Sequence, residues 1–331
     1  MKAQVVHQLG GIEALTFEEA PEPPLPSGHV RIGVRAAALN VPDLLIIQGL
    51  YQFRPELPFS PGAEAAGVVL EVGEGVDTVG VGDRVVGVAT SGALAEQFVA
   101  PGASTFAIPD ELPFVTAAAI PMIYGTSYHA LVDRAHLEPG ETLLVTGASG
   151  GVGSAAVQLG KVLGARVIAA VGSDAKAEVA RSLGADETIV YTSESLRERV
   201  KEMTGGAGAD VIYDPVGGDI FLECLRCVAW EGRVLVVGFT SGTIPQAPTN
   251  LVLLKGSSIV GVFWGDFARR DPAANRSNLA RIMEMAIGGR IEPHISHTVP
   301  LAEAAHGLEE IAARRATGKV IVTVGGGSSG A

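Results

Sequence analysis

Residues 142–171 read TLLVTGASGGVGSAAVQLGKVLGARVIAAV, and their pattern indicates the fold class. A strand is expected over 142–147, a short segment with the apolar centre Leu143, Leu144 and Val145. Apolar residues at helical spacing predict a helix over 153–163, and a second apolar strand follows over 166–171. Strand, helix and strand in this order predict one βαβ unit of a parallel sheet.

Glycines are concentrated in the turn between the first strand and the helix, where residues 146–153 read TGASGGVG. Gly150 and Gly153 match the second and third glycines of the G-x-G-x-x-G pattern, and Ala148 replaces the first. Glycine lets the backbone turn tightly and approach a pyrophosphate, whose charge the helix N-terminus stabilises. The flanking strand and helix favour a dinucleotide-binding loop. The alternative is a tight turn with a structural role only.

The alternation of strands and helices continues beyond this unit. Further strands are expected over 188–191, 210–214, 233–239 and 258–263, and helices over 175–183, 195–203 and 221–229. Strands that are apolar on both faces are typical of a parallel sheet covered by helices on both sides. The sequence therefore predicts an α/β domain with a doubly wound parallel sheet.

The two ends of the chain have a different pattern. Short alternating or β-branched strands predict a β-rich first third, with strands over 3–7, 29–38, 65–72 and 84–88. After Trp264, helices are expected over 278–287 and 301–314, and a last strand over 319–324. No helix and strand follow that last strand, so a return to the first domain would give it a partner.

Composition narrows the class of protein. A chain of 331 residues with 47% hydrophobic residues favours two compact domains. The formal net charge of −12 lacks the basic footprint that nucleic-acid partners require. No signal-peptide pattern or membrane-length apolar run occurs, so we expect a cytoplasmic protein without a membrane partner. The glycine- and serine-rich tail 325–331 is predicted to be disordered.

The residues that follow the second strand, 166–171, help to distinguish an NADPH enzyme from an NAD enzyme. Val171 is followed by the neutral residues Gly172 and Ser173, where NAD enzymes place an acid for the ribose 2′-hydroxyl. Gly172 and Ser173 leave room for a phosphate that Lys176 can neutralise, so we predict NADPH. Two alternatives stay open. Asp174 can be the ribose acid of an NAD enzyme, and Lys176 can be a solvated helix residue.

Four separated groups of motifs resemble one family. They are AALNVPD and GLY (37–43, 49–51), PFSPGAEAAGVV, VGEGV and GDRV (58–69, 72–76, 82–85), YGTS and GGVG (124–127, 150–153), and RATGKV (315–320). On these motifs the chain resembles the zinc-independent, zeta-crystallin-like quinone oxidoreductases of the medium-chain dehydrogenase/reductase superfamily. The resemblance implies a GroES-like catalytic domain from residues 1–122 and 265–331, a Rossmann domain from 123–264, and an active site in the cleft between them.

The resemblance also implies which residues bind the cofactor. Thr126 is expected to contact the nicotinamide side and Phe239 to line the cofactor wall. The pyrophosphate is expected to contact three residues of the glycine-rich turn: Gly150, Gly151 and Val152. The adenosine 2′-phosphate is expected to lie among Ser173, Lys176, Tyr191 and Arg315. Simpler alternatives exist for three of these: Arg315 can stabilise a helix end, Tyr191 can be an aromatic at a strand end, and Phe239 can be a core residue.

No zinc site is predicted. Ala63 stands where the related zinc alcohol dehydrogenases have a histidine ligand, and no cysteine precedes Cys224. Cys224 and Cys227 have C-x-x-C spacing, but no second pair exists, so buried packing is predicted in place of a metal or redox role. His294 and His297 have no cysteine or carboxylate motif beside them, and we predict no metal there.

Without zinc ligands, hydride transfer to a conjugated carbonyl is the favoured reaction, because the developing oxyanion needs only hydrogen-bond donors. We predict a quinone acceptor. The alternatives are an enone, enal or enoyl-thioester acceptor and a non-catalytic NADPH-binding protein.

Tyr51 and Asn40 are the candidate donors to the acceptor oxygen, with Asp43 ordering them. Asn40 can instead be a turn residue, Tyr51 can line a pocket, and Asp43 can cap a helix. Family members commonly dimerise through the last Rossmann strand, so a homodimer through residues 258–263 is expected.

Overall fold

The computed structural model describes residues 1–325. These form two compact units: the first unit contains residues 1–122 and the chain from Pro293 onward, and the second unit contains residues 123–292. The tail that is predicted to be disordered lies outside the described residues, except for Gly325. Within residues 1–325, no helix has both the length and the apolar character needed to cross a membrane.

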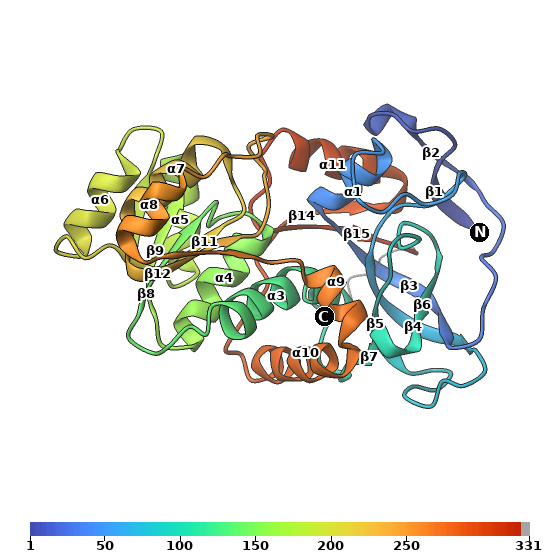
Figure 1. Ribbon diagram of the computed structural model, residues 1–331. Helices are drawn as coiled ribbons and strands as arrows, with labels where there is room; N and C mark the ends of the chain where they lie inside the picture. The colour runs from blue at the N-terminus through green and yellow to red at the C-terminus, as the bar shows by residue number, and fades with distance from the viewer. Residues whose placement is uncertain (326–331) are drawn as a thin grey trace. The chain divides into compact units, whose positions relative to one another are not determined.

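A six-stranded parallel sheet forms the centre of the second unit (Figure 1). Its strand order is β10-β9-β8-β11-β12-β13, so the order reverses between β8 and β11. This is the doubly wound topology predicted above, in which ligands bind at the carboxyl ends of the strands near the reversal. The bounds are β8 (Thr142–Thr146), β9 (Arg166–Val171), β10 (Glu187–Val190), β11 (Ala209–Asp214), β12 (Val228–Val236) and β13 (Ser258–Gly261).

Helices cover both faces of this sheet, because successive strand residues point to opposite sides. Leu143 and Val167 face α4, where Gly160 leaves them room. Leu144 and Ile168 belong to a buried cluster on the other face, together with residues of α6 and α7. The helices are α3 (Pro121–Tyr128), α4 (Gly151–Val162), α5 (Asp174–Ser182), α6 (Leu196–Met203), α7 (Gly218–Cys227) and α8 (Thr249–Lys255), and a π-helical turn spans His129–Arg134.

Two more helices, α9 (Trp264–Arg270) and α10 (Pro272–Ile287), also belong to the second unit. The rings of His129 and Phe267 stack with centroids 4.0 Å apart. The Asn278 amide donates to Asp133 Oδ2 over 2.8 Å. The structure therefore places the boundary between residues 292 and 293, and the predicted boundary after residue 264 is wrong at this point. The amphipathic pattern of α10 indicates that one face of the helix is buried. It does not indicate which of the two sheets this face packs against.

The first unit contains a seven-stranded sheet of order β14-β15-β3-β4-β5-β7, in which β6 also pairs with β3, and a separate β1-β2 hairpin. The strands are β1 (Lys2–Val6), β2 (Leu15–Glu19), β3 (His29–Leu39), β4 (Glu64–Val72), β5 (Arg84–Val88), β6 (Gln97–Pro101), β7 (Thr105–Ala107), β14 (Ile295–Pro300) and β15 (Lys319–Thr323). The helices are α1 (Val41–Ile47), α2 (Phe114–Ala118) and α11 (Ala304–Ala312), with 3-10 turns at Ile12–Ala14, Gly102–Ser104 and Leu301–Glu303.

Both ends of the chain contribute to this sheet. The last strand, β15, pairs antiparallel with β3, and Val320 lies opposite Leu39. In Figure 1 the red strand β15 accordingly lies beside the blue strand β3, and β14 pairs with the other edge of β15. The expected return of the last strand to the first domain is confirmed.

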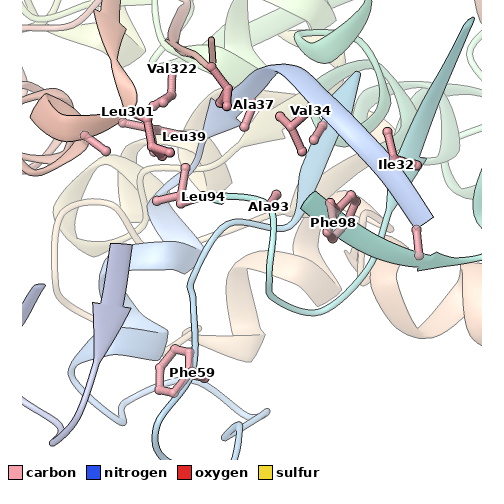
Figure 2. Packing of buried hydrophobic residues seen from close by; sticks show 14 of the residues in the cluster. Ile32, Val34, Ala37, Leu39, Phe59, Ala93, Leu94, Phe98, Leu301 and Val322 are labelled. Carbon is pink, nitrogen blue, oxygen red and sulfur yellow. The ribbon is translucent and has the colours of Figure 1, made fainter. Parts of the chain in front are cut away.

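The core of the first unit combines residues from distant parts of the sequence (Figure 2). Figure 2 shows Leu39 of β3 close to Leu301 and Val322 from the C-terminal part of the chain, and Ile32 close to Phe98. All five side chains are buried. The C-terminal segment is thus an integral part of this core, which fixes the register of β15 against β3.

Candidate cofactor and acceptor sites

The glycine-rich turn joins β8 to α4 in the second unit. Gly147 has a φ of 57°, a left-handed conformation that favours glycine, and the Gly150 amide donates to its carbonyl over 2.9 Å. A Cβ atom on Gly153 would lie 2.2 Å from that same carbonyl oxygen, so only glycine lets α4 begin this close to the turn. The first amides of α4, at Gly151 and Val152, lie in the turn of the helix whose N–H groups have no intrahelical acceptor, where an anion can bind.

A buried hydroxyl pair connects this loop to the segment that carries Thr126. Ser127 Oγ donates to the Val152 carbonyl over 2.9 Å and lies 2.9 Å from the Tyr213 hydroxyl. Since the single hydroxyl proton of Ser127 goes to Val152, the Tyr213 hydroxyl is the donor in the second bond. Burial raises the pKa of Tyr213, which keeps this proton in place. Thr126, half-buried, is therefore held next to a residue that is bonded to the glycine-rich loop.

Asp214 is a buried carboxylate at the end of β11 that sequence reasoning missed. It accepts hydrogen bonds from Thr146 Oγ1 over 2.6 Å and from the Val216 amide over 3.0 Å. Burial raises the pKa of Asp214, while these donors lower it. The carboxylate thus ties the end of β8 to the loop after β11. An acid at the carboxyl end of an apolar parallel strand is the sequence signal that could have indicated it.

The residues predicted to bind the 2′-phosphate within the second unit lie together. Ser173 caps α5, and its Oγ accepts from the Lys176 amide over 3.4 Å. The Tyr191 ring lies over Gly172, where an added Cβ would be 3.4 Å from the phenolic oxygen. Asp174, the alternative ribose acid, is exposed in the first turn of α5. Gly172, Ser173, Lys176 and Tyr191 therefore meet at the carboxyl ends of β9 and β10.

Phe239 and Arg315 have other surroundings. Phe239 is 39% exposed, so it is not a core residue, and an added Cβ on Gly217 would lie 3.0 Å from its ring. Arg315 follows α11 in the first unit, where its guanidinium donates to Glu310 Oε2 and Oε1 over 2.9 and 2.8 Å. Both side chains retain exposed surface for a ligand.

In the first unit, a buried lysine organises the predicted acceptor side. Lys319 Nζ donates to Leu39 O, Asn40 Oδ1 and Glu64 Oε1 over 2.9, 2.6 and 2.9 Å. Glu64 Oε2 accepts from the Met122 amide over 2.8 Å. Sequence reasoning missed Lys319 because a lysine at a strand end is usually solvated.

Asn40 does not have the free donor that was predicted. Its Nδ2 donates to Glu64 Oε1 over 3.0 Å and to Ala38 O over 3.2 Å, and its Oδ1 accepts from Lys319. An amide group has two N–H bonds, and both are already used within the protein. The geometry therefore does not support Asn40 as a donor to an acceptor carbonyl and gives it a structural role at the start of α1.

Asp43 and Tyr51 interact electrostatically. Asp43 Oδ2 accepts from the Asn40 backbone amide over 2.7 Å, as a helix-capping residue does. Burial raises the pKa of Asp43 to about 7; the Asn40 amide and the charge of Lys319 lower it, and the charge of Glu64 raises it. Burial and the Asp43 charge raise the pKa of Tyr51, so its hydroxyl keeps its proton and can donate it to a hydrogen bond.

Comparison with known proteins gives consistent matches over the whole fold. Residues 26–110 match the alcohol dehydrogenase GroES-like domain, and residues 151–280 match the zinc-binding dehydrogenase family. Quinone oxidoreductase-like protein 2 of Bos taurus is 42% identical over 94% of this chain and 89% of its own length. The chain belongs to the quinone oxidoreductase family of the medium-chain dehydrogenase/reductase superfamily.

Solved structures of quinone oxidoreductases have the same fold. The enzyme of Pseudomonas syringae is 34% identical, with a TM-score of 0.90 over 97% of this chain and 99% of that chain. The Escherichia coli quinone oxidoreductase, solved as a complex with NADPH, is 29% identical, with a TM-score of 0.90 over 98% of this chain and 100% of that chain.

The residues of this quinone oxidoreductase family member do not fit a catalytic zinc ion. Zinc requires three or four thiolate, imidazole or carboxylate ligands. Ala63 offers none, and Glu64 is already bound to the cationic Lys319, whose charge repels a second cation. Among residues 1–325, no three or more His, Cys, Asp and Glu side chains form a group that could hold a metal ion.

The two cysteines and two histidines singled out in the sequence are engaged in local contacts. Cys224 and Cys227 are buried in α7, where burial raises the pKa of both thiols, to about 12 for Cys227. His294 Nε2 lies 3.0 Å from Thr317 Oγ1, and His297 Nδ1 lies 2.9 Å from Ser296 Oγ. The buried thiols of Cys224 and Cys227 are unreactive at neutral pH, in agreement with the packing role predicted for them.

Proposed function

We propose that this protein is an NADPH-dependent oxidoreductase that transfers hydride to a conjugated carbonyl acceptor, a quinone in the first place. The observation that carries this proposal is the close approach of Gly153 to Gly147 at the N-terminus of α4, a tight glycine turn of the kind on which a dinucleotide pyrophosphate binds. The family of the chain and the NADPH complex of the Escherichia coli enzyme support the choice of cofactor.

The residues of the second unit fit NADPH. Gly150, Gly151 and Val152 would hold the pyrophosphate, and Thr126 would contact the nicotinamide side. Gly172, Ser173, Lys176 and Tyr191 would surround the 2′-phosphate, and Phe239 would line the cofactor wall. The contact of Arg315 with the 2′-phosphate stays a prediction of the family resemblance. When bound, NADPH supplies the hydride.

On the acceptor side, Tyr51 is the donor that the structure supports. Reduction of a quinone places negative charge on an oxygen, and a protonated phenol can stabilise that charge through a hydrogen bond. A tyrosine phenol with its ordinary pKa near 10 is already protonated at neutral pH, and burial raises the pKa of Tyr51 further. Asn40 and Asp43 order the turn that precedes Tyr51 and, in this proposal, do not contact the acceptor.

The proposed reaction is tested by following NADPH oxidation with a panel of quinones and a panel of enones and enals, each with and without a metal chelator. Turnover of quinones that is unaffected by the chelator supports the proposal. Faster turnover of the enals would make the protein an enone reductase. Tight NADPH binding without turnover of either panel would indicate a non-catalytic binding protein.

The homodimer is proposed through the edge of the second unit's sheet. Strand β13 is the last strand of that sheet, with one neighbour, β12. Ile259 on β13 is 38% exposed, and Phe263 just beyond it is 53% exposed. An apolar edge strand is suited to pairing with the same strand of a second copy.

Lys176→Ala is expected to weaken NADPH binding about tenfold and to leave NADH binding unchanged, because a lost charge-assisted bond to the 2′-phosphate costs about 1.4 kcal/mol or more. Titration of the nucleotide fluorescence measures both affinities. Arg197→Ala, which removes an exposed cation from α6, is the matched control. Equal loss for NADPH and NADH would contradict the assignment of the phosphate group.

A further inference from the structure

The buried ion pair of Lys319 and Glu64 has an unusual environment for two charged side chains. Their side chains are 2% and 0% exposed, and Nζ lies 2.9 Å from Oε1. An ammonium group has three N–H donors, and the three oxygens of Leu39, Asn40 and Glu64 use all of them. A buried ion pair adds little net stability over apolar side chains of similar size, because desolvation offsets the attraction. A gain in folding stability therefore does not explain the presence of this buried ion pair.

The ion pair determines the orientation of the Asn40 amide. Oδ1 must face the ammonium, and Nδ2 must face the carboxylate of Glu64 and the carbonyl of Ala38. A flipped amide would place its N–H groups against the Lys319 donors. Asn40 is the N-terminal cap of α1, and its backbone amide donates to Asp43 Oδ2. The pair therefore fixes the start of α1 in one conformation.

Helix α1 leads directly to Tyr51. The Gly49 amide donates to Ile46 O over 3.0 Å, and the Leu50 amide donates to Leu45 O over 2.8 Å, so the segment after α1 is bonded back to the helix. Tyr51 packs against the apolar core of the first unit. A shift at the start of α1 would consequently move the phenol.

The same side chains also set the electric field at the phenol. The carboxyl groups of Glu64 and Asp43 both interact electrostatically with the ammonium of Lys319. The Asp43 charge acts on Tyr51, and the Lys319 charge acts on Asp43. At the alkaline pH where Tyr51 titrates, both carboxyl groups are ionised, so removing the ammonium leaves two like charges without a compensating cation.

We propose that Lys319 and Glu64 are positioning residues for Tyr51: the tethered ammonium fixes the turn from Asn40 to Asp43 and balances the carboxylate charge that acts on the phenol. The inference rests on the proposed function, because it takes Tyr51 as the donor. The ion pair lies in the first unit and the glycine-rich loop in the second. Loss of the pair is therefore expected to affect the acceptor step and not the affinity for NADPH.

Lys319→Met tests the proposal with two readouts. The expected results are a kcat for quinone reduction at least about tenfold lower, since small displacements of a positioned group have effects of this size, and a higher midpoint for the alkaline titration of Tyr51. The titration is followed by phenolate absorbance, with Tyr51→Phe in each background as the reference. The Kd for NADPH is expected to stay within about twofold.

Lys161→Met is the matched control. Lys161 also pairs with a carboxylate, Asp186, over 2.7 Å, but both side chains are more than one-third exposed. It is expected to change neither the kcat nor the Tyr51 midpoint, because exposed ion pairs contribute little.

If Lys319→Met does not fold, chemical rescue of Lys319→Ala tests the proposal in its place. Lys319→Ala is purified in n-propylammonium, which carries the missing N–H donors, and is compared with the same protein in tetramethylammonium, which has none. Saturable recovery of kcat and of the melting temperature with propylammonium alone supports the proposal. Equal behaviour in the two salts overturns it.

Different results would contradict the proposed function and the positioning role of Lys319 and Glu64. If the wild type reduces no acceptor, the proposed function fails, and the Tyr51 titration alone decides the positioning role. If the wild type reduces quinones while folded Lys319→Met keeps its kcat or its Tyr51 midpoint, the positioning role is overturned and the proposed function stands.

Discussion

Gly153→Ala is expected to weaken NADPH binding by at least about a hundredfold. The added Cβ would lie 2.2 Å from the Gly147 carbonyl oxygen and 2.9 Å from Ala148 Cα, both of them backbone atoms that cannot turn away. The start of α4 must then move off the loop, and the amides of Gly151 and Val152 lose their alignment toward the pyrophosphate. Overpacking of this kind costs about 1–3 kcal/mol, and the lost alignment adds to it. Calorimetric titration with NADPH measures the effect.

Gly265→Ala is the control for this substitution. Gly265 lies in α9 of the same unit, where an added Cβ would meet Phe263 at 3.7 Å, an ordinary contact distance. Its NADPH affinity is expected to equal that of the wild type. A folded Gly153→Ala protein with wild-type affinity would remove the main support for the dinucleotide site.

Asp43→Asn is expected to change how stability depends on pH. Burial raises the pKa of Asp43 from its ordinary 3.8 to about 7, so the folded protein holds this proton more tightly than the unfolded chain. Stability must then fall as pH rises from about 4 to about 7, by up to about 4 kcal/mol. Asparagine cannot ionise, so the variant gains on the wild type over this window. Urea unfolding at pH 4, 5, 6, 7 and 8 measures the difference.

Asp77→Asn is the control for the pH series, since Asp77 is an exposed aspartate of the same unit. Its difference from the wild type is expected to stay constant across the series. If the difference between Asp43→Asn and the wild type is also constant from pH 4 to pH 8, then the Asp43 carboxyl is not destabilised by burial as the structure indicates.

Sequence periodicity predicted the six strands of the second unit's sheet and the helices α4 to α7, because neighbouring residues decide these elements. It did not predict α3, α8 or α9. The alternation over 142–171 gives β8, α4 and β9 with boundaries close to the observed ones. The segment 265–292 was assigned to the wrong unit, because the contacts of Asn278 and Phe267 with residues near 130 leave no mark in local spacing.

The acceptor side was harder to predict, because it depends on one contact between distant segments. Lys319 meets Glu64 across 255 positions of sequence, and neither residue has a distinctive pattern around it. Without knowledge of this pair, Asn40 was predicted to have a free amide. For Asp43, the open alternative of a helix cap is the one that the structure shows, because a cap is a local feature.

The pairing of β15 with β3 sets an order of assembly during synthesis. The second unit is continuous and has all its strands once residue 292 has left the ribosome, so it can fold while synthesis goes on. The sheet of the first unit must wait for Lys319–Thr323, and until then one edge of β3 has no partner over residues 36–39. During that interval Glu64 also lacks its cation. Until the last strand pairs, this edge of β3 is open to pairing with another chain.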